Sequence, residues 1–213
     1  MSTVKLRIGP ADDGRAMTLE EFREAEEQPG YLYELARGVL EVSEVPADDH
    51  GQIVDNLHEA MSEYRRQHPG SRIRRIAHGS DIRLIIPELV SDRHPDLAIV
   101  FWGAPLTERG RQRPGLVSEV VSPGKRARHR DFEAKSEEYL ALGIDEYWII
   151  DPRERQVVVR TRQDGPEGPF WSERIFTGDE VIVSGLLPGF QATVAQLWIN
   201  AEPEQDHDPG DGE

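Results

Sequence analysis

The chain has 213 residues, no cysteine and a formal net charge of −15. Its length allows one domain with a sizeable core, and its lack of cysteine excludes disulfides and thiolate metal sites. It contains neither an apolar run long enough to span a bilayer nor an apolar signal segment, so we expect a cytoplasmic protein without a membrane anchor.

The charge is unevenly distributed along the chain. Acidic residues are concentrated in residues 20–27 and 202–213, whereas the middle is basic. A net acidic protein is not a typical nucleic-acid coat, but screening over about 8 Å at physiological salt lets a local basic rim hold phosphates. The basic residues of the middle are Arg72, Arg74, Arg75, Arg109, Arg111, Arg113, Lys125, Arg126, Arg128 and Arg130.

The first half of the chain alternates helix and strand signals. Thr18 is a typical N-cap, and the acidic residues after it predict a helix through residue 27. Alternating apolar residues predict a hairpin of two strands, 31–35 and 39–43. Apolar residues at helical spacing predict a long helix that starts near Ala47 and ends at His68. Two further strands are predicted over residues 71–77 and 80–86.

The second half is richer in strands. Residues 97–101 and 116–121 are predicted to be neighbouring strands, followed by a break at Pro123 and Gly124. A helix is predicted from about residue 130 to Leu142, with Gly143 as its C-cap. Strands are then predicted over residues 145–150, 156–161, 172–176 and 180–183, and residues 194–199 form either a last strand or a short helix.

These elements predict one domain with two appendages. Residues 1–16 are predicted to be an untethered lead-in, residues 17–200 a single domain, and residues 201–213 an acidic, disordered tail. The mixture of helices and strands predicts an α/β protein.

Two acidic residues lie among the apolar residues of the predicted strands. Asp96 directly precedes the strand over residues 97–101, and Glu119 shares one face of its strand with Val117 and Val121. Burial of an unpaired carboxylate is costly, so Glu119 lies either on a solvated face or beside a cation. Asp96 has an alternative as an ordinary turn residue before a strand.

Lys135 is the third residue of this set. Helical spacing places it on one stripe with Phe132, Tyr139 and Leu142, and we expect that stripe to face the sheet. An inward lysine suggests a need for a compact ammonium group, and the alternative is a lysine at the helix edge whose head reaches solvent. Two carboxylates and one lysine are the minimum set for metal-assisted hydrolysis of a phosphodiester, and carboxylate oxygens suit Mg²⁺.

Six segments of the chain together resemble a known family. They are MTLEEF, YELARGVLEVS, DDHGQIVDNL, HPDLAIV, LVSEVVSPGKRARHRDFEAKSEEYLALGIDEYWIIDP and GLLPGFQATVAQLW, between residues 17 and 198. In this order they are similar to successive blocks of the Uma-two family, restriction-endonuclease-like proteins of the PD-(D/E)xK nuclease superfamily. The resemblance implies a restriction-endonuclease-like mixed sheet core of αβββαβ type, with an N-terminal hairpin and a C-terminal β extension.

The resemblance also implies roles for individual residues. Asp96 and Glu119 would bind the divalent ion, Mg²⁺ or Mn²⁺, with the carbonyl of Val120 as a further oxygen ligand. Val121 stands where the superfamily motif has lysine, a departure that assigns the lysine role to Lys135 on the following helix.

Other residues are candidates for accessory roles. Glu34 would reach the ion through a metal-bound water, and His50 would touch water or phosphate, although a structural role is the alternative for both. A set that follows the Glu119 strand would contact the DNA backbone, or would form an ordinary solvated charge run. Its members are Ser122, Lys125, Arg126, Arg128 and Arg130.

The leading hypothesis is a Mg²⁺-dependent DNA endonuclease that acts as a homodimer. Two alternatives from other classes stay open. A catalytically inactive descendant would keep the fold as a DNA- or protein-binding module, and an acidic interaction protein would depend on its tail and its net charge. A loss of metal binding on replacement of Glu119 by Gln would distinguish the first hypothesis from the other two.

Overall fold

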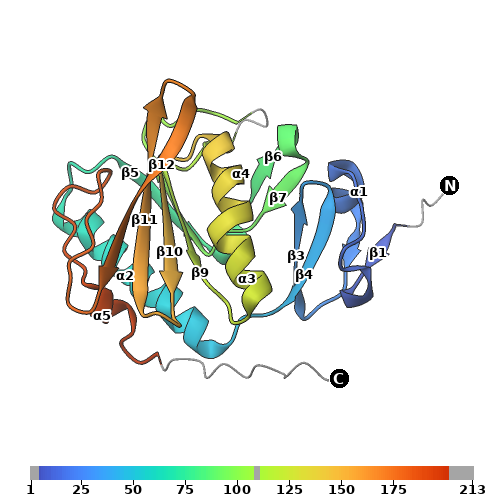
Figure 1. Ribbon diagram of the computed structural model, residues 1–213, viewed down its shortest axis with the longest axis horizontal. Helices are drawn as coiled ribbons and strands as arrows, with labels where there is room; N and C mark the ends of the chain where they lie inside the picture. Colours follow the sequence, from blue (N-terminus) through green and yellow to red (C-terminus); the bar gives the residue numbers. More distant parts are fainter. Residues whose placement is uncertain (1–4, 108–110, 202–213) are drawn as a thin grey trace. The chain divides into compact units, whose positions relative to one another are not determined.

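The computed structural model describes residues 5–107 and 111–201, and within them the chain divides into two compact units (Figure 1). The first unit contains residues up to 46 and residues 82–94, and the second contains residues 47–81 and those from 95 onward. The sequence predicts one domain over residues 17–200. The two compact units do not show whether the chain folds as one domain or two, so this stays a prediction. The predicted acidic tail and Arg109 lie outside the described residues, except for Ala201.

The first unit is built around the predicted hairpin. A four-stranded sheet has the order β4-β3-β7-β6, and a two-stranded sheet joins β1 to β2. Leu35 and Leu40 of the hairpin are fully buried in a small apolar core. The elements are β1 (Arg7–Ile8), η1 (Pro10–Asp12), α1 (Leu19–Glu24), β2 (Glu26–Glu27), β3 (Tyr31–Ala36), β4 (Val39–Glu44), β6 (Leu84–Ile86), η3 (Pro87–Leu89) and β7 (Ser91–Arg93).

Three details of the first unit differ from the sequence-based expectation. The described part of the predicted lead-in is held to the fold, because β1 pairs in parallel with β2 and Ile8 is buried. Since Glu26 and Glu27 form β2, α1 ends at Glu24 instead of continuing to residue 27. Thr18 caps α1 as predicted. Of the strand predicted over residues 80–86, only residues 84–86 form a strand, β6. Its partner β7 was not predicted, because its residues show no alternation of apolar and polar side chains.

The second unit has a six-stranded sheet of order β12-β11-β10-β9-β8-β5. β9 and β10 are parallel, and the other neighbours are antiparallel. The elements are α2 (Asp48–Gln67), β5 (Ile73–His78), η2 (Gly79–Asp81), β8 (Leu97–Phe101), β9 (Leu116–Val120), α3 (Lys125–His129), η4 (Arg130–Ala134), α4 (Lys135–Leu142), β10 (Glu146–Asp151), β11 (Gln156–Gly165), β12 (Gly168–Thr177) and α5 (Val194–Leu197).

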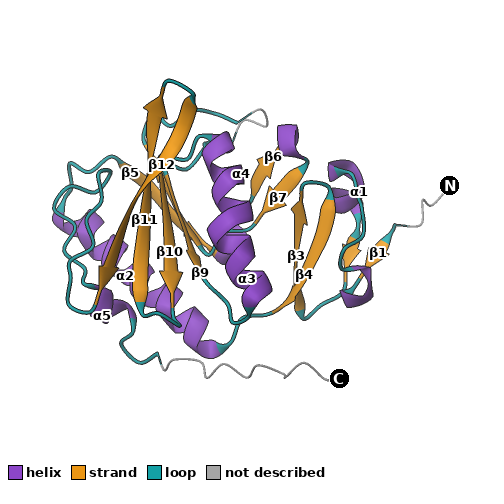
Figure 2. Ribbon diagram, viewed as in Figure 1, coloured by secondary structure: helices purple, strands orange, loops and turns teal. Residues whose placement is uncertain are grey.

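The chain order of this unit reproduces the predicted core. α2, the three strands β5, β8 and β9, the helical segment α3–α4 and strand β10 form the αβββαβ series, and β11 and β12 extend the sheet (Figure 2). The parallel pairing of β9 and β10 follows from the helix that connects them, since a crossover helix returns the chain to the same edge in the same direction. The fold is therefore of the restriction-endonuclease-like α/β type that was predicted.

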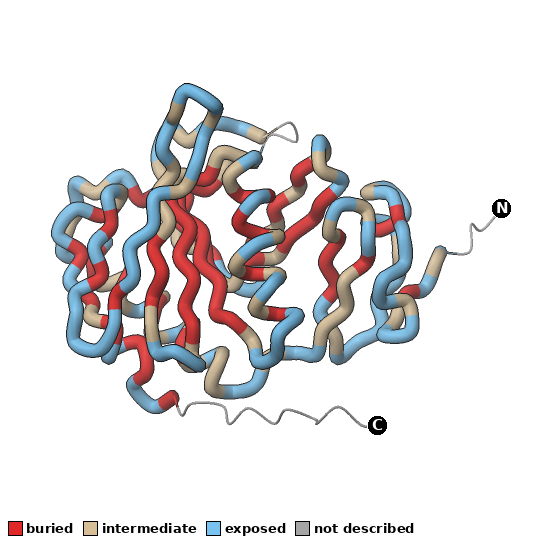
Figure 3. Tube along the Cα trace, viewed as in Figure 1, coloured by how far each residue is buried: buried red, intermediate tan, exposed pale blue. Residues whose placement is uncertain are grey.

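The sheet is covered by helices on both faces. Leu116, Val120 and Trp148 face the side of α2, where they join a core with Ile53 and Leu57. The alternate residues of β9 and β10 face α4 instead, because successive side chains of a strand point to opposite faces. β9 and β10 are buried along their whole length (Figure 3). Glu119 therefore lies on the inner, α4-facing side of the sheet and not on a solvated face.

The helical segment before β10 starts earlier than predicted. It begins at Lys125, five residues before the predicted start, and contains a π-helical turn, η4, between α3 and α4. It ends at Leu142, and the C-cap Gly143 has a φ of 81°, the left-handed conformation expected of a glycine there. Residues 180–183 form only an isolated bridge from Val181 to Thr193, and the last element is the short helix α5.

Candidate active site

The candidate site lies where β8 begins and β9 ends. The antiparallel register pairs Leu97 with Ser118, so one further step places Asp96 opposite Glu119. Asp96 is fixed there because its Oδ2 accepts a hydrogen bond of 2.7 Å from the backbone N–H of Val120. The two carboxylates predicted to act together therefore occupy facing positions on neighbouring strands.

Lys135 reaches this position from the first turn of α4. Its Nζ lies 3.0 Å from Oε2 of Glu119, and both side chains are only 4% exposed. Of the two alternatives for Glu119, the structure therefore shows the one in which the carboxylate lies beside a cation. A buried carboxylate beside a buried ammonium needs further hydrogen bonds to be stable.

Tyr139 supplies one of these hydrogen bonds. Its hydroxyl donates to Oε1 of Glu119 over 2.5 Å, and its side chain is fully buried. Tyr139 and Lys135 are four residues apart on one helix, so both point to the same part of the sheet. The sequence placed Tyr139 on the inward stripe but gave no sign that its hydroxyl would bind Glu119.

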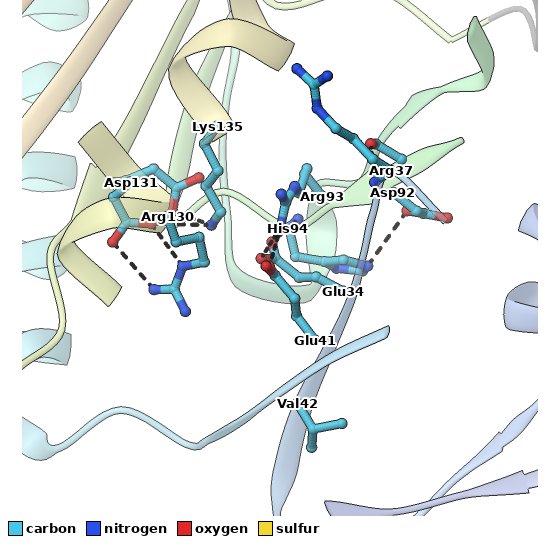
Figure 4. A network of polar contacts seen from close by, with 12 residues as sticks. Glu34, Arg37, Glu41, Val42, Asp92, Arg93, His94, Arg130, Asp131 and Lys135 are labelled. Carbon is cyan, nitrogen blue, oxygen red and sulfur yellow. Dashed lines mark hydrogen bonds and ion pairs between the residues drawn. The ribbon is translucent and has the colours of Figure 1, made fainter. Parts of the chain in front are cut away.

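Asp131 is a second buried acid that sequence reasoning missed. It is fully buried, and its Oδ1 lies 3.8 Å from Nζ of Lys135 (Figure 4). Arg130 pairs with both of its oxygens, at 2.9 and 3.2 Å. Asp131, Lys135 and Tyr139 follow one another at intervals of four, and this spacing is the signal that could have indicated a shared face.

The surroundings of Asp131 keep a neighbouring tyrosine protonated. The hydroxyl of Tyr147 on β10 donates to the backbone carbonyl of Asp131 over 2.8 Å. Burial raises the pKa of Tyr147 well above its ordinary value, and the charges of Glu119 and Asp131 raise it further. Tyr147 is therefore a neutral hydrogen-bond donor that ties the π-helical turn to the sheet.

His50 approaches the second carboxylate of the pair. It lies in the first turn of α2, with its Nε2 3.1 Å from Oδ1 of Asp96 and its side chain only 11% exposed. The structure thus brings His50 together with Asp96, and its predicted accessory role stays a prediction. Together with the Val120 amide, His50 places a group next to each oxygen of Asp96.

The donor set is suited to a hard divalent cation. Asp96, Glu119 and the carbonyl of Val120 are all oxygen donors, and Mg²⁺ is usually held by one or two carboxylates while it keeps several waters. In the described parts of the chain, no group of three or more His, Asp or Glu side chains is arranged to hold a metal ion by itself. An ion bound here would therefore take its remaining ligands from the backbone, water and substrate.

Glu34 lies in the first unit, in a network of its own. It accepts hydrogen bonds from the side chain of Arg93 at 3.2 Å and from the backbone N–H of His94 at 2.7 Å. Arg93 is fully buried and also contacts Glu41 at 2.5 Å (Figure 4). These contacts give Glu34 a structural role in its unit, and its predicted role as an accessory acid stays a prediction.

The predicted DNA-contacting residues separate into two groups. Lys125 and Arg126 are exposed at the start of α3, next to the half-buried Ser122. Arg128 and Arg130 are half-buried and pair with buried carboxylates. Arg128 contacts Asp151 at 2.5 Å and lies 4.4 Å from the ring centre of Phe132, so part of its charge is used within the fold.

A cavity lies elsewhere in the second unit. It has a volume of about 480 Å³ and is lined by residues such as Phe101, Trp102, Pro114, Gly115 and Asp145. Phe101 ends β8 and Gly115 precedes β9, whereas Asp96 and Glu119 lie at the opposite ends of these strands. This cavity is therefore separate from the candidate site.

Comparison with known proteins places the chain in a family. The model of the Uma2 family, described as "Putative restriction endonuclease", matches residues 19–195. A crystal structure titled as a putative nuclease belonging to DUF820, from Anabaena variabilis ATCC 29413, has a TM-score of 0.64 at 19% identity and covers 85% of this chain and 97% of that one. A search of curated proteins gives no match.

The match to the family model covers most of the chain and includes Asp96, Glu119 and Lys135. At 19% identity the solved structure supports the fold alone, and this fold agrees with the restriction-endonuclease-like core. None of the helices in the described residues is long and apolar enough to cross a membrane. The chain belongs to the Uma2 family, whose model carries the description "Putative restriction endonuclease".

Proposed function

We propose that the protein is a divalent-metal-dependent DNA endonuclease, with Asp96, Glu119 and Lys135 as its catalytic residues. The observation that supports this most is the position of Glu119, which lies 3.0 Å from Lys135 and faces Asp96 across two neighbouring strands. The nuclease description of the family agrees with this proposal.

The proposed ion is Mg²⁺ or Mn²⁺. Asp96, Glu119 and the Val120 carbonyl would hold it, and when bound it would supply a water of lowered pKa and neutralise phosphate charge. Lys135 would stabilise negative charge that develops on the phosphate or orient the attacking water. Asp131 keeps the ammonium of Lys135 beside Glu119.

The exposed basic residues at the start of α3 would position the DNA. Lys125 and Arg126 follow the end of β9 by a few residues and are exposed, so a phosphate can approach them. Such contacts give affinity that depends on salt but not on sequence. Because a duplex has two strands to cut, we also propose that the protein acts as a homodimer, which light scattering of the purified protein tests.

One observation favours a second candidate function. Both oxygens of Glu119 already contact a hydrogen-bond donor or a cation, and its side chain is almost completely buried. A protein that had lost catalysis would keep this pairing as a stabilising core and use the fold to bind DNA or another protein. The two candidates differ in whether Glu119 also accepts a metal ion.

A cleavage assay tests the proposal. Supercoiled plasmid and structured DNA are incubated with Mg²⁺ or Mn²⁺ and with wild type, Asp96→Asn or Lys135→Ala. We expect cleavage by wild type and its loss in both variants. Asp145→Asn, a carboxylate change at the separate cavity, is the matched control and should cleave as wild type does. DNA binding without cleavage by wild type, unchanged in Asp96→Asn, would support the binding module instead.

A further inference from the structure

We infer that Tyr139 is a positioning residue for the metal site, because its hydroxyl orients the carboxylate of Glu119 toward the cation. This inference rests on the proposed function and adds a residue to it. Tyr139 would not contact the ion or the DNA, and it would act entirely through Glu119.

The first observation is the division of the two Glu119 oxygens between two different partners. Oε1 accepts from the Tyr139 hydroxyl at 2.5 Å, and Oε2 faces the Lys135 ammonium at 3.0 Å. The terminal torsion of a glutamate has broad preferences, so its partners decide how the carboxylate is oriented. Tyr139 and Lys135 lie on one helix and contact different oxygens, so both help to set that orientation.

The second observation is that the Tyr139 ring is itself held in place. Its ring is fully buried and meets the ring of Tyr147 edge to face, with centroids 5.0 Å apart and an interplanar angle of 83°. Tyr147 lies on β10, and two residues further along the same strand Ile149 pairs with Glu119. The Tyr139 ring is therefore packed against the strand next to the one that carries Glu119.

The chemistry of the two partners makes their roles different. An ammonium at Oε2 carries a positive charge that repels a cation, whereas a phenol hydroxyl is neutral. An ionised carboxylate oxygen has two lone pairs, so a hydrogen bond from Tyr139 does not by itself prevent Oε1 from binding a metal ion. The Tyr139 hydroxyl can therefore orient the carboxylate without adding positive charge beside the cation.

The test is the affinity for Mn²⁺ of wild type and Tyr139→Phe, measured by isothermal titration calorimetry without DNA. Removal of the hydroxyl should weaken binding by about 10- to 100-fold, the usual effect of losing a group that orients a metal ligand. Replacement of Tyr139 by 4-aminophenylalanine, which keeps a donor at the same place on the ring, should restore most of the affinity.

Tyr147→Phe is the matched control. It deletes the same atom from a neighbouring, fully buried ring, but its hydroxyl donates to the backbone of Asp131 and not to Glu119. We expect it to lower the urea midpoint of unfolding without weakening Mn²⁺ binding. Equal weakening in both variants would mean a general loosening of the core and would overturn the inference, as would wild-type affinity in Tyr139→Phe. Absence of Mn²⁺ binding by wild type would overturn the proposed function and this inference with it.

Discussion

Replacement of Lys135 by Met tests whether the buried ion pair is built as the structure describes. The change keeps most of the apolar stem of the side chain but removes the ammonium, which lies 3.0 Å from Glu119 and 3.8 Å from Asp131. With an effective dielectric constant of about 20, these distances correspond to roughly 5.5 and 4.4 kcal/mol of attraction. The desolvation of the ammonium opposes both terms.

The net loss should be about 3–5 kcal/mol in the free energy of unfolding, the usual cost of leaving a buried partner charge uncompensated. Urea unfolding followed by circular dichroism measures it. Lys125→Met is the matched control, because Lys125 is exposed on α3 and its replacement should change stability by less than about 0.5 kcal/mol. The double variant Lys135→Met/Glu119→Gln should recover about 1–3 kcal/mol, since the buried negative charge is removed together with the ammonium. A loss below about 1 kcal/mol in Lys135→Met would refute the buried pair.

Three further predictions concern other parts of the second unit. Glu146 is fully buried and accepts hydrogen bonds from Trp148, Ser184 and the segment after it, so Glu146→Gln should lower stability by about 2 kcal/mol in urea unfolding while Mn²⁺ affinity stays at the wild-type value. Burial, and then the charge of the nearby His78, lower the pKa of His58. Its neutral form is therefore favoured in the folded state, so stability should fall as the pH drops below about 6.5, and this fall should be smaller in His58→Gln. The Arg126→Glu variant should reduce the slope of DNA affinity against salt by about 1, measured by fluorescence anisotropy, and an unchanged slope would exclude Arg126 from the DNA contact.

The sequence predicted the core of the fold because its signals are local. The strand over residues 97–101, the long helix after Ala47 and the glycine cap at Gly143 each follow from a short pattern that the structure confirms. The π-helical turn could not be predicted in this way, because it lies in a charged run without apolar periodicity. Its extra residue per turn changes which residues face inward, so Asp131 is fully buried while Phe132, on the predicted stripe, is only half-buried.

The positions of the candidate site residues were more predictable than their contacts. The facing positions of Asp96 and Glu119 follow from two neighbouring antiparallel strands, and Lys135 follows from the helical stripe. The spacing of four residues could have indicated that Asp131 and Tyr139 share a face with Lys135, but their contacts depend on how the helix is rotated against the sheet. A sequence pattern does not give that rotation, since it is set by packing across several strands.

The location of bound Mn²⁺ is the most direct test of a hydrolytic site in this protein. Crystals of the wild-type protein grown or soaked with MnCl₂ would reveal the ion by its anomalous scattering. We predict a peak bonded to carboxylate oxygens of both Asp96 and Glu119, and its absence in crystals of Glu119→Gln. A protein that cleaves DNA with Mn²⁺ but binds the ion elsewhere, with neither carboxylate as a ligand, would contradict the proposed site.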